Sequence, residues 1–382
     1  MTQSTPNGYR VIERSAELND AARQLAKTHE IAFDLEADSM YHFQEKVCLI
    51  QIATGNDTLV VDPLKVNDLS PLKPVMANSR IRKVLHGADY DIRSLYRDFG
   101  IEVHNLFDTE LASRFLGIRE TGLDAVLQQR FSVGLDKKYQ RKDWSKRPLP
   151  EAMMNYAAGD VHHLLPLAAI LDKELSDMGR IAWVREECDL LSQVRPPEPN
   201  NAPLFLNFKG SGRLNPRSLA VLESLLQLRR RLAETKDRPL FKVLSNKSML
   251  TLATTMPVTP RALEQAGALS QKQIQIHGKA LLQAIRTARD LPEKELPIYP
   301  RQRSPRLPAR VPDRMAVLKE WRDCKAEALG LDPGLMLNKA LMQAIAIRHP
   351  QTINDLEMIP DLHQWRHKEF GHDIVEIMKN AR

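Results

Sequence analysis

The sequence predicts an α/β domain with a mixed sheet, followed by two smaller all-α domains. Three observations carry this prediction. Strand-like and helix-like segments alternate over residues 1–194, which is the pattern of an α/β domain. Two stretches rich in proline divide the remainder of the chain, as linkers do. Beyond the first of these stretches the strand signals fade and amphipathic helices remain.

The elements of the α/β domain are read from apolar periodicity. Strands are expected at 30–37, 47–54, 57–64 and 82–87, and helices at 17–29, 88–100 and 150–179. The last helix has Pro150 at its start and Gly179 at its end, where helices favour these residues. Pro166 lies inside it and should kink the helix or split it in two.

The predicted domain boundaries follow the two proline-rich stretches. We expect an α/β domain at 1–194, a linker at 195–215, a helical domain at 216–291, a proline-rich linker at 292–310 and a second helical domain at 311–382. Residues 220–234 parallel 316–330, and 278–285 parallel 371–378, which indicates a duplicated helical module. A chance match between two heptad-like patterns remains the alternative.

Composition favours a cytoplasmic protein that does not enter a membrane. The chain has 382 residues, of which 43% are hydrophobic and 27% charged. No apolar run approaches the roughly 20 residues that span a bilayer, and residues 1–20 lack the apolar segment of a secretory signal. Cys48, Cys188 and Cys324 are far apart in sequence, which predicts neither a disulfide framework nor a cysteine-based zinc site. We expect a monomer.

Positive charge is concentrated in the middle of the chain. Residues 195–310 contain 21 Lys and Arg against 8 Asp and Glu, a net charge of +13, whereas 1–194 carry −5 and 311–382 carry −1. A basic block of this kind is typical of proteins that neutralise nucleic-acid phosphates. The alternative is a solvated helical face without a ligand.

Two acids interrupt an apolar strand segment, IAFDLEADSM at 31–40. On a strand, Asp34 and Glu36 point to the same side, about 7 Å apart along the chain. Such a pair repels itself and needs a basic side chain, a shared proton or a divalent metal nearby. Taken alone, the pair also fits a solvent-facing strand edge.

Two further segments carry acids with helical placement. Asp89 and Asp91 fall in the first turn of the helix expected after Gly87, where acids favour the positive end of the helix dipole. Asp89 suits that position, and Asp91 needs a further explanation. Tyr156 and Asp160 are spaced i, i+4, so both side chains point the same way on a helix. Packing together with a surface acid is the alternative for this pair.

Together, these segments resemble the motifs of the DEDD superfamily of 3′→5′ exonucleases, in the subgroup that has a tyrosine in its third motif. The matching stretches are FDLEAD (33–38), HGADYDIRSL (86–95) and YAAGD (156–160). FDTELASRFLG (107–117) and GLDKKYQRKDWSKRPL (134–149) resemble the ribonuclease D family. The two helical modules resemble the helicase-and-RNase-D C-terminal (HRDC) domain. The resemblance implies a ribonuclease H-like mixed-sheet exonuclease domain followed by two HRDC helical bundles.

The resemblance implies a catalytic centre made of Asp34, Glu36, Asp91, Tyr156 and Asp160. The four acids would bind two divalent cations, and hard oxygen donors suit Mg²⁺ or Mn²⁺. Tyr156 would orient the attacking water. The implied activity is metal-dependent release of 5′-mononucleotides from RNA 3′ ends, with tRNA precursors as substrates. The alternatives are a 3′→5′ exonuclease acting on DNA and a non-catalytic RNA-binding protein.

A basic segment at 141–148 is the candidate substrate contact, with Arg141, Trp144 and Arg147 as its expected residues. Trp144 could stack on a base, or it could be a buried anchor for the segment. His86, at the end of a strand before Gly87, is interpreted as a structural residue that hydrogen-bonds the backbone.

Overall fold

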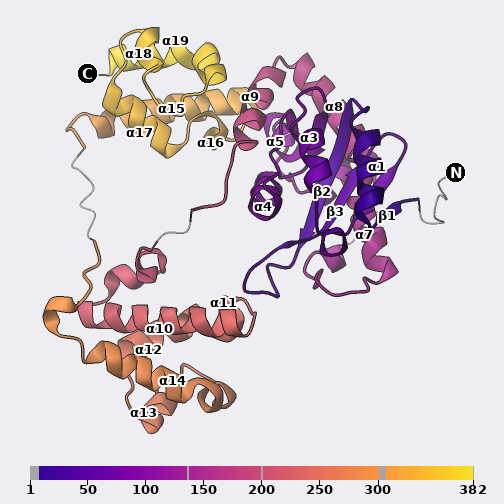
Figure 1. Cartoon of the computed structure of the whole chain (residues 1–382). Coiled ribbons are helices and arrows are strands. Elements are labelled where there is room, and N and C mark those ends of the chain that lie inside the picture. Colours follow the sequence, from indigo (N-terminus) through magenta and orange to yellow (C-terminus); the bar gives the residue numbers. More distant parts are fainter. Residues whose placement is uncertain (1–7, 136, 199–200, 301–306, 382) are drawn as a thin grey trace. The chain divides into compact units, whose positions relative to one another are not determined.

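A computed structural model describes residues 8–135, 137–198, 201–300 and 307–381 (Figure 1). The chain forms two compact units. The first contains residues 1–37, 47–196 and 304–382, and the second contains residues 38–46 and 197–303. Each unit is described by itself.

The first unit is built on a six-stranded sheet with the strand order β1-β4-β3-β2-β5-β6. Its strands are β1 (Arg10–Ile12), β2 (Glu30–Ala37), β3 (Val47–Ala53), β4 (Thr58–Val61), β5 (Arg82–Leu85) and β6 (Leu106–Asp108). The central strand β2 is antiparallel to β3 and parallel to β5, which confirms the predicted mixed sheet. Strands β1 and β6 were not predicted from the sequence because three residues are too few to show a period.

Helices cover this sheet and fill the connections between its strands. They are α1 (Ser15–Leu25), α2 (Pro63–Val66), α3 (Lys73–Met76), α4 (Asp89–Phe99), α5 (Thr109–Phe115), α6 (Leu123–Phe131), α7 (Glu151–His162), α8 (Leu164–Asp177) and α9 (Ile181–Leu191), with short 3₁₀ turns at Ser70–Leu72 and Lys137–Tyr139. Helix α7 packs against β2, β3 and β4. The helix expected over 150–179 is split at His163, so Pro166 lies in the first turn of α8, where a missing N–H is tolerated.

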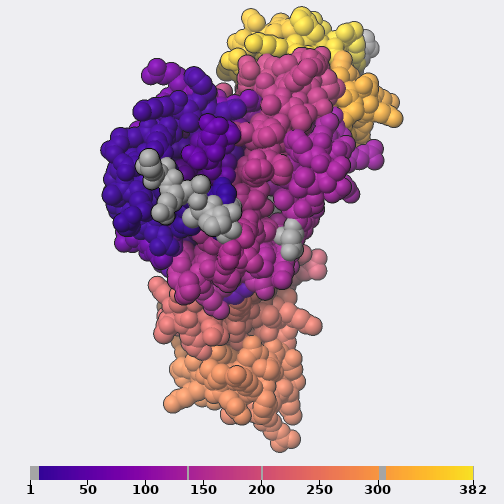
Figure 2. Space-filling view, turned by 90° about the vertical axis from the view of Figure 1, so that its right-hand side faces the viewer, coloured from indigo at the N-terminus to yellow at the C-terminus, as the bar shows by residue number. Residues whose placement is uncertain are grey.

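The C-terminal helices belong to the first unit and share its hydrophobic core. They are α15 (Val311–Leu329), α16 (Pro333–Met336), α17 (Lys339–Arg348), α18 (Ile353–Leu356) and α19 (Gln364–Asn380). Trp365 of α19 stacks on Trp183 of α9, with ring centroids 4.8 Å apart, and its Nε1 donates to Glu187 Oε1 at 2.7 Å. Figure 2 shows the yellow C-terminal residues directly against the magenta to pink chain that carries α8 and α9. This module is therefore an integral part of the first unit.

The backbone approaches itself closely at the same junction. Gly117 has φ +82°, and a Cβ at this position would lie 2.3 Å from the carbonyl oxygen of Gly330, so a side chain cannot be accommodated. Beside it, the guanidinium of Arg180 donates to the carbonyl oxygens of Phe115 and Leu329, at 2.8 and 2.6 Å. One buried cation thus joins the end of α5 to the end of α15.

The second unit is a helical bundle that repeats the C-terminal module. Its helices are α10 (Pro216–Thr235), α11 (Leu240–Val243), α12 (Asn246–Thr255), α13 (Pro260–Gln265) and α14 (Gln271–Arg289). Long, short, medium, short and long helices follow in the order seen from α15 to α19, which agrees with duplication. Residues of both expected linkers join this core: Phe205 is buried, and Tyr299 Oη donates to the carbonyl oxygen of Leu206 at 3.2 Å. Residues 199–200 and 301–306 of those linkers lie outside the described residues.

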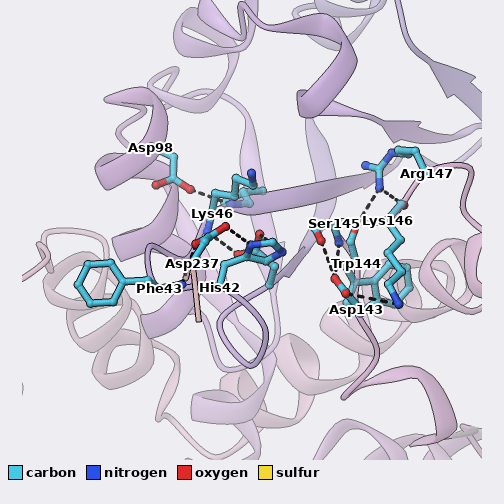
Figure 3. A network of polar contacts seen from close by, with 12 residues as sticks. His42, Phe43, Lys46, Asp98, Asp143, Trp144, Ser145, Lys146, Arg147 and Asp237 are labelled. Atoms are coloured by element: carbon cyan, nitrogen blue, oxygen red, sulfur yellow. Dashed lines mark hydrogen bonds and ion pairs between the residues drawn. The ribbon is translucent and has the colours of Figure 1, made fainter. Parts of the chain in front are cut away.

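The segment 38–46, which follows β2 in the chain, is held by side chains of the second unit. Asp237 accepts a hydrogen bond from the backbone N–H of Phe43 at 3.0 Å and lies 2.6 Å from His42 Nδ1 (Figure 3). The ammonium of Lys242 lies 4.0 Å from the centre of the Tyr41 ring, within the range of a cation–π contact. These contacts explain why the segment belongs to this unit.

The three cysteines are free thiols, with Cys48 and Cys188 buried and Cys324 exposed. Among the described residues, no helix combines the length and the apolar composition that crossing a bilayer requires.

The shared core makes a prediction about Trp365. Because its side chain is 3% exposed and packs on Trp183, Trp365→Ala should lower the free energy of unfolding by about 3–5 kcal/mol. The measurement is urea denaturation followed by far-UV circular dichroism. Trp321→Ala is the control, because this half-buried ring contacts only the edge of the cluster at Phe370 and should cost less. Equal losses in the two variants would contradict the shared core.

Candidate active site

Three elements bring the acids singled out by the sequence together. Strand β2 carries Asp34 and Glu36 on one face, and helix α7 packs against β2 and carries Tyr156 and Asp160. Helix α4 carries Asp91 in its first turn. The carboxyl of Glu36 is subject to the charges of the other three acids, so the four groups form one electrostatic cluster.

The turn that starts α4 is fixed by Asp108 at the end of β6. Its carboxylate accepts from the backbone N–H groups of Gly87 and Ala88, at 2.9 and 2.8 Å, and also caps α5 through the N–H of Glu110 at 2.8 Å. Gly87 has φ +71°, and a Cβ there would lie 2.8 Å from Glu110 Oε2. Only glycine fits this turn without displacing Glu110, and the turn sets where Asp91 enters the site.

Burial raises the pKa values of all four acids, and the charges of neighbouring acids add to this effect for Glu36, Asp91 and Asp160. Burial raises the pKa of Asp34 to about 7. Burial, followed by the charge of Asp34, raises the pKa of Asp160 to about 8. Burial, followed by the charges of the other acids, raises the pKa of Glu36 to about 10. Burial and the Asp34 charge hold the pKa of Asp91 well above its usual range. Without a cation, the site therefore retains protons at neutral pH.

Tyr156 is a neutral hydrogen-bond donor in this cluster. Burial, followed by the charges of Asp160 and Glu36, raises the pKa of its phenol, and the hydroxyl is hydrogen-bonded to Asp160. The ring lies between those of Tyr139 and Trp144, with centroid distances of 5.7 and 6.1 Å. A phenol held in this way cannot act as a base near pH 7, and it is well placed to orient a hydrogen-bonding partner.

A cavity of about 490 Å³ opens over the acids. Its lining includes Asp34, Glu36, Tyr156 and Asp160, together with His86, Gly87, Glu110, Asp124, Lys137 and Gln140. Lys137 lies 2.8 Å from Asp124 in an ion pair. Neither Lys137 nor Gln140 was predicted from the sequence, although both belong to the KKYQ stretch that directly precedes the basic segment 141–148.

The side chains fit a divalent cation by their chemistry. The four carboxyl groups lie in one cluster, and burial is the first cause of each raised pKa. Among the described residues, no Lys or Arg lowers these pKa values. When ionised, the four groups form a set of hard oxygen donors. Within the part of the chain that the structure describes, no three His, Cys, Asp or Glu side chains already form a metal-binding group. Carboxylates that no cation neutralises repel one another, which is consistent with the absence of such a group among the described residues.

The basic segment 141–148 is anchored rather than open. The guanidinium of Arg147 forms an ion pair with buried Asp62, at 2.6 Å, and donates to the carbonyl oxygen of Cys48 at 2.8 Å. It also donates to the carbonyl oxygen of Trp144, at 2.7 Å (Figure 3). The Trp144 side chain is completely buried, so it offers no face on which a base could stack. Its position is that of a buried anchor for the segment. Arg141 is exposed.

His86, which follows β5, contacts helix α5 and also lines the cavity. Its Nδ1 lies 2.9 Å from Thr109 Oγ1, while the ring also lines the cavity. Burial lowers the pKa of the imidazole, against the opposing charges of Asp108 and Glu110. The ring is therefore neutral at pH 7 and tied to α5.

Comparison with known proteins agrees with this fold. A family model described as 3′-5′ exonuclease matches residues 9–176, and the HRDC domain model matches residues 218–285 and 312–378. The fold and site thus define a 3′→5′ exonuclease with two HRDC domains. The chain belongs to the ribonuclease D family of exoribonucleases.

Two ribonuclease D relatives match nearly the whole length of the chain, and an RRP6 catalytic core matches three quarters of it. Ribonuclease D of Pseudomonas paraeruginosa is 30% identical over 373 residues, which are 97% of each chain. The crystal structure of Escherichia coli RNase D, an exoribonuclease involved in structured RNA processing, is 26% identical, covers 97% of this chain and 99% of that chain, and has a TM-score of 0.72. The catalytic core of RRP6 from Trypanosoma brucei is 29% identical, covers 75% of this chain and 83% of that chain, and has a TM-score of 0.66.

The raised pKa values predict that the metal-free protein loses stability as pH rises. In the folded chain, Asp34, Asp160 and Glu36 keep protons up to pH values of about 7, 8 and 10, whereas the unfolded chain releases them at about pH 4. The folded state therefore binds more protons across this window, and the free energy of unfolding falls with increasing pH. Melting temperatures measured in chelator from pH 5 to 9 should decrease.

The control for this prediction is Asp34→Asn, which removes one of the repelling charges. Its melting temperature should fall less steeply over the same pH range. Added Mg²⁺ should stabilise the wild-type protein more at pH 8 than at pH 6, because binding requires ionised carboxylates. A wild-type melting temperature that rises with pH in chelator, relative to the variant, would contradict the raised pKa values.

Proposed function

We propose that the chain removes nucleotides from RNA 3′ ends by hydrolysis that depends on divalent cations. The single observation that carries this proposal is the convergence of Asp34, Glu36, Asp91 and Asp160, in which the charge of Asp34 raises the pKa values of the other three acids. These four side chains would hold two Mg²⁺ or Mn²⁺ ions. When bound, the ions would supply a water of lowered pKa and would stabilise charge on the departing 3′ oxygen.

The residues of the chain have distinct roles in this reaction. Asp34 and Glu36 on β2 and Asp160 on α7 line the cavity from opposite elements, so a terminal phosphodiester between them meets carboxylates on two sides. Tyr156 donates a hydrogen bond and orients the attacking water without taking its proton. Cleavage of the bond between phosphorus and the 3′ oxygen releases a 5′-mononucleotide and leaves a new 3′ hydroxyl.

We propose Lys137 as the cation that faces the substrate, in place of Arg147. Lys137 lines the cavity, and its side chain is 58% exposed. Arg147 is committed to Asp62 and to two backbone carbonyls. Trp144 acts by supporting the Tyr156 ring, and Arg141 remains a candidate contact on the exposed surface.

The proposed substrate is structured RNA, with 3′-extended tRNA precursors as the specific class. The positive charge of residues 195–310 supports binding to a polyanion. The involvement of the E. coli relative in structured RNA processing agrees with this proposal. A timed digest of a 3′-extended tRNA, with Mg²⁺ and then with chelator, tests it. A matched DNA strand that is degraded at the same rate would favour the alternative, a 3′→5′ exonuclease for DNA.

Substitution of the acids tests the catalytic centre. Asp34→Asn should reduce the rate of nucleotide release more than about 100-fold. Loss of a residue that only hydrogen-bonds a metal ligand typically costs about 10- to 100-fold in activity, and loss of the ligand itself should cost more. Tyr156→Phe should lower kcat and leave binding of RNA unchanged, since it removes only the hydroxyl. Release of labelled nucleotide in single turnovers is the measurement, and circular dichroism checks folding. Full activity of folded Asp34→Asn excludes the proposed reaction.

The two HRDC domains should differ in RNA binding. The double substitution Arg230→Glu and Arg231→Glu, at two exposed positions of α10, should weaken binding of RNA. The slope of log K against log salt concentration should become shallower by about 0.7 for each RNA phosphate that is no longer neutralised. The matched control is Lys339→Glu with Lys368→Glu, which makes the same charge change on exposed positions of the C-terminal module. Fluorescence anisotropy at two salt concentrations is the measurement. Equal weakening in the two variants would contradict the predicted difference.

A further inference from the structure

Gln51 is a buried amide without a partner. Its side chain on β3 is 0% exposed, and among the described residues neither its nitrogen nor its oxygen has a hydrogen-bond partner. Buried polar groups are almost always paired, because an unpaired one loses its hydration without compensation. An amide with both ends unsatisfied therefore needs an explanation.

The strand register shows which groups surround this amide. Gln51 lies directly opposite Asp34 on β2 and directly opposite Val60 on β4. Opposed residues of antiparallel strands project from the same face, with Cβ atoms about 5 Å apart. The next residues on this face of β3 are Leu49 and Ala53. The polar side chains that neighbour Gln51 within the sheet are therefore Asp34 directly opposite it and, on the diagonals, Glu36 of β2 and Thr58 of β4. Of these, only Asp34 lies directly opposite the amide.

Substrate contact does not explain the amide. Gln51 does not line the cavity over the acids, and its side chain has no exposed surface. Packing does not explain it either, because Leu49 and Val60, its neighbours on this face, are apolar and would accept a side chain of the same shape without polar atoms. The indole N–H of Trp144, in the same cluster, also has no hydrogen-bond partner among the described residues, and it could pair only with the amide oxygen, which leaves the Gln51 donor unexplained.

The geometry points to Gln51 as a positioning residue for Asp34, whose carboxylate it holds by a donated hydrogen bond when a divalent cation is bound. This inference rests on the proposed function of the acids. An ionised carboxylate has about four lone-pair directions, so it can bind cations and still accept from Nε2. A neutral amide provides this bond without a positive charge that would compete with the metal. Partners of this type set the orientation of metal ligands.

The test compares Gln51→Met with Leu49→Met. Methionine preserves the length of the Gln51 side chain and removes its donors, and Leu49 occupies the same face of β3 opposite Glu36. Mn²⁺ binding to the full-length protein is measured by electron paramagnetic resonance. Gln51→Met should weaken Mn²⁺ binding by about 10-fold or more, with the melting temperature in chelator unchanged or raised. Leu49→Met should bind Mn²⁺ as the wild type does.

Activity provides a second readout. RNA hydrolysis by Gln51→Met should recover at correspondingly higher Mn²⁺ concentrations, because the side chain acts through the ligand and not on the substrate. Wild-type Mn²⁺ affinity in Gln51→Met overturns the inference, as does an equal weakening in Leu49→Met. If Gln51→Met does not fold, nuclear magnetic resonance of the wild-type protein provides the test. The side-chain amide resonance of Gln51, assigned by comparison with Gln51→Asn, should shift when Mg²⁺ is added. An unshifted resonance also overturns the inference.

The outcome separates this inference from the proposed function. Should the wild-type protein bind no Mn²⁺, the metal-dependent reaction itself is excluded. Should Asp34→Asn lose Mn²⁺ binding while Gln51→Met retains it, the reaction stands and Gln51 has no part in it.

Discussion

Repulsion among four clustered carboxylates is the constraint on which the first unit depends. The charge of Asp34 raises the pKa values of Glu36, Asp91 and Asp160, so the site is unfavourable unless protons or cations neutralise it. The surrounding structure provides the opposing free energy. Apolar packing of α7 on the sheet and the bonds from Asp108 to the turn before α4 keep the acids together. A divalent cation bound among these carboxylates would relieve this repulsion.

The duplicated modules have become different parts of the molecule. The C-terminal copy shares a hydrophobic core with the exonuclease domain, through the stack of Trp365 on Trp183 and the approach of Gly117 to Gly330. The first copy has its own core and most of the excess positive charge. A surface committed to intramolecular packing is unavailable to RNA. Sequence similarity between two repeats therefore does not establish that they have similar roles.

The sequence predicts the parts of the site that follow from local patterns. Strand β2 is long and apolar, so its bounds and the shared face of Asp34 and Glu36 could be read directly. The spacing of Tyr156 and Asp160 on α7 was equally local. Long-range contacts were not predictable: Arg147 was named a candidate substrate contact, and nothing local in the sequence indicates its ion pair with Asp62, which is 85 residues away. Gln51 gave no signal, since its meaning depends on the register with β2.

The distribution of charge along the chain follows from a conflict between binding and catalysis. The substrate and the active site are both anionic, so the attraction that brings RNA to the protein must come from other residues. A dense cluster of lysines beside the acids would pair with them, as Lys137 pairs with Asp124 at the cavity, and would compete with divalent cations. Placing a net charge of +13 in residues 195–310 avoids this competition, because those residues include none of the four acids. In the proposed function, catalysis and capture of RNA therefore belong to separate parts of the chain.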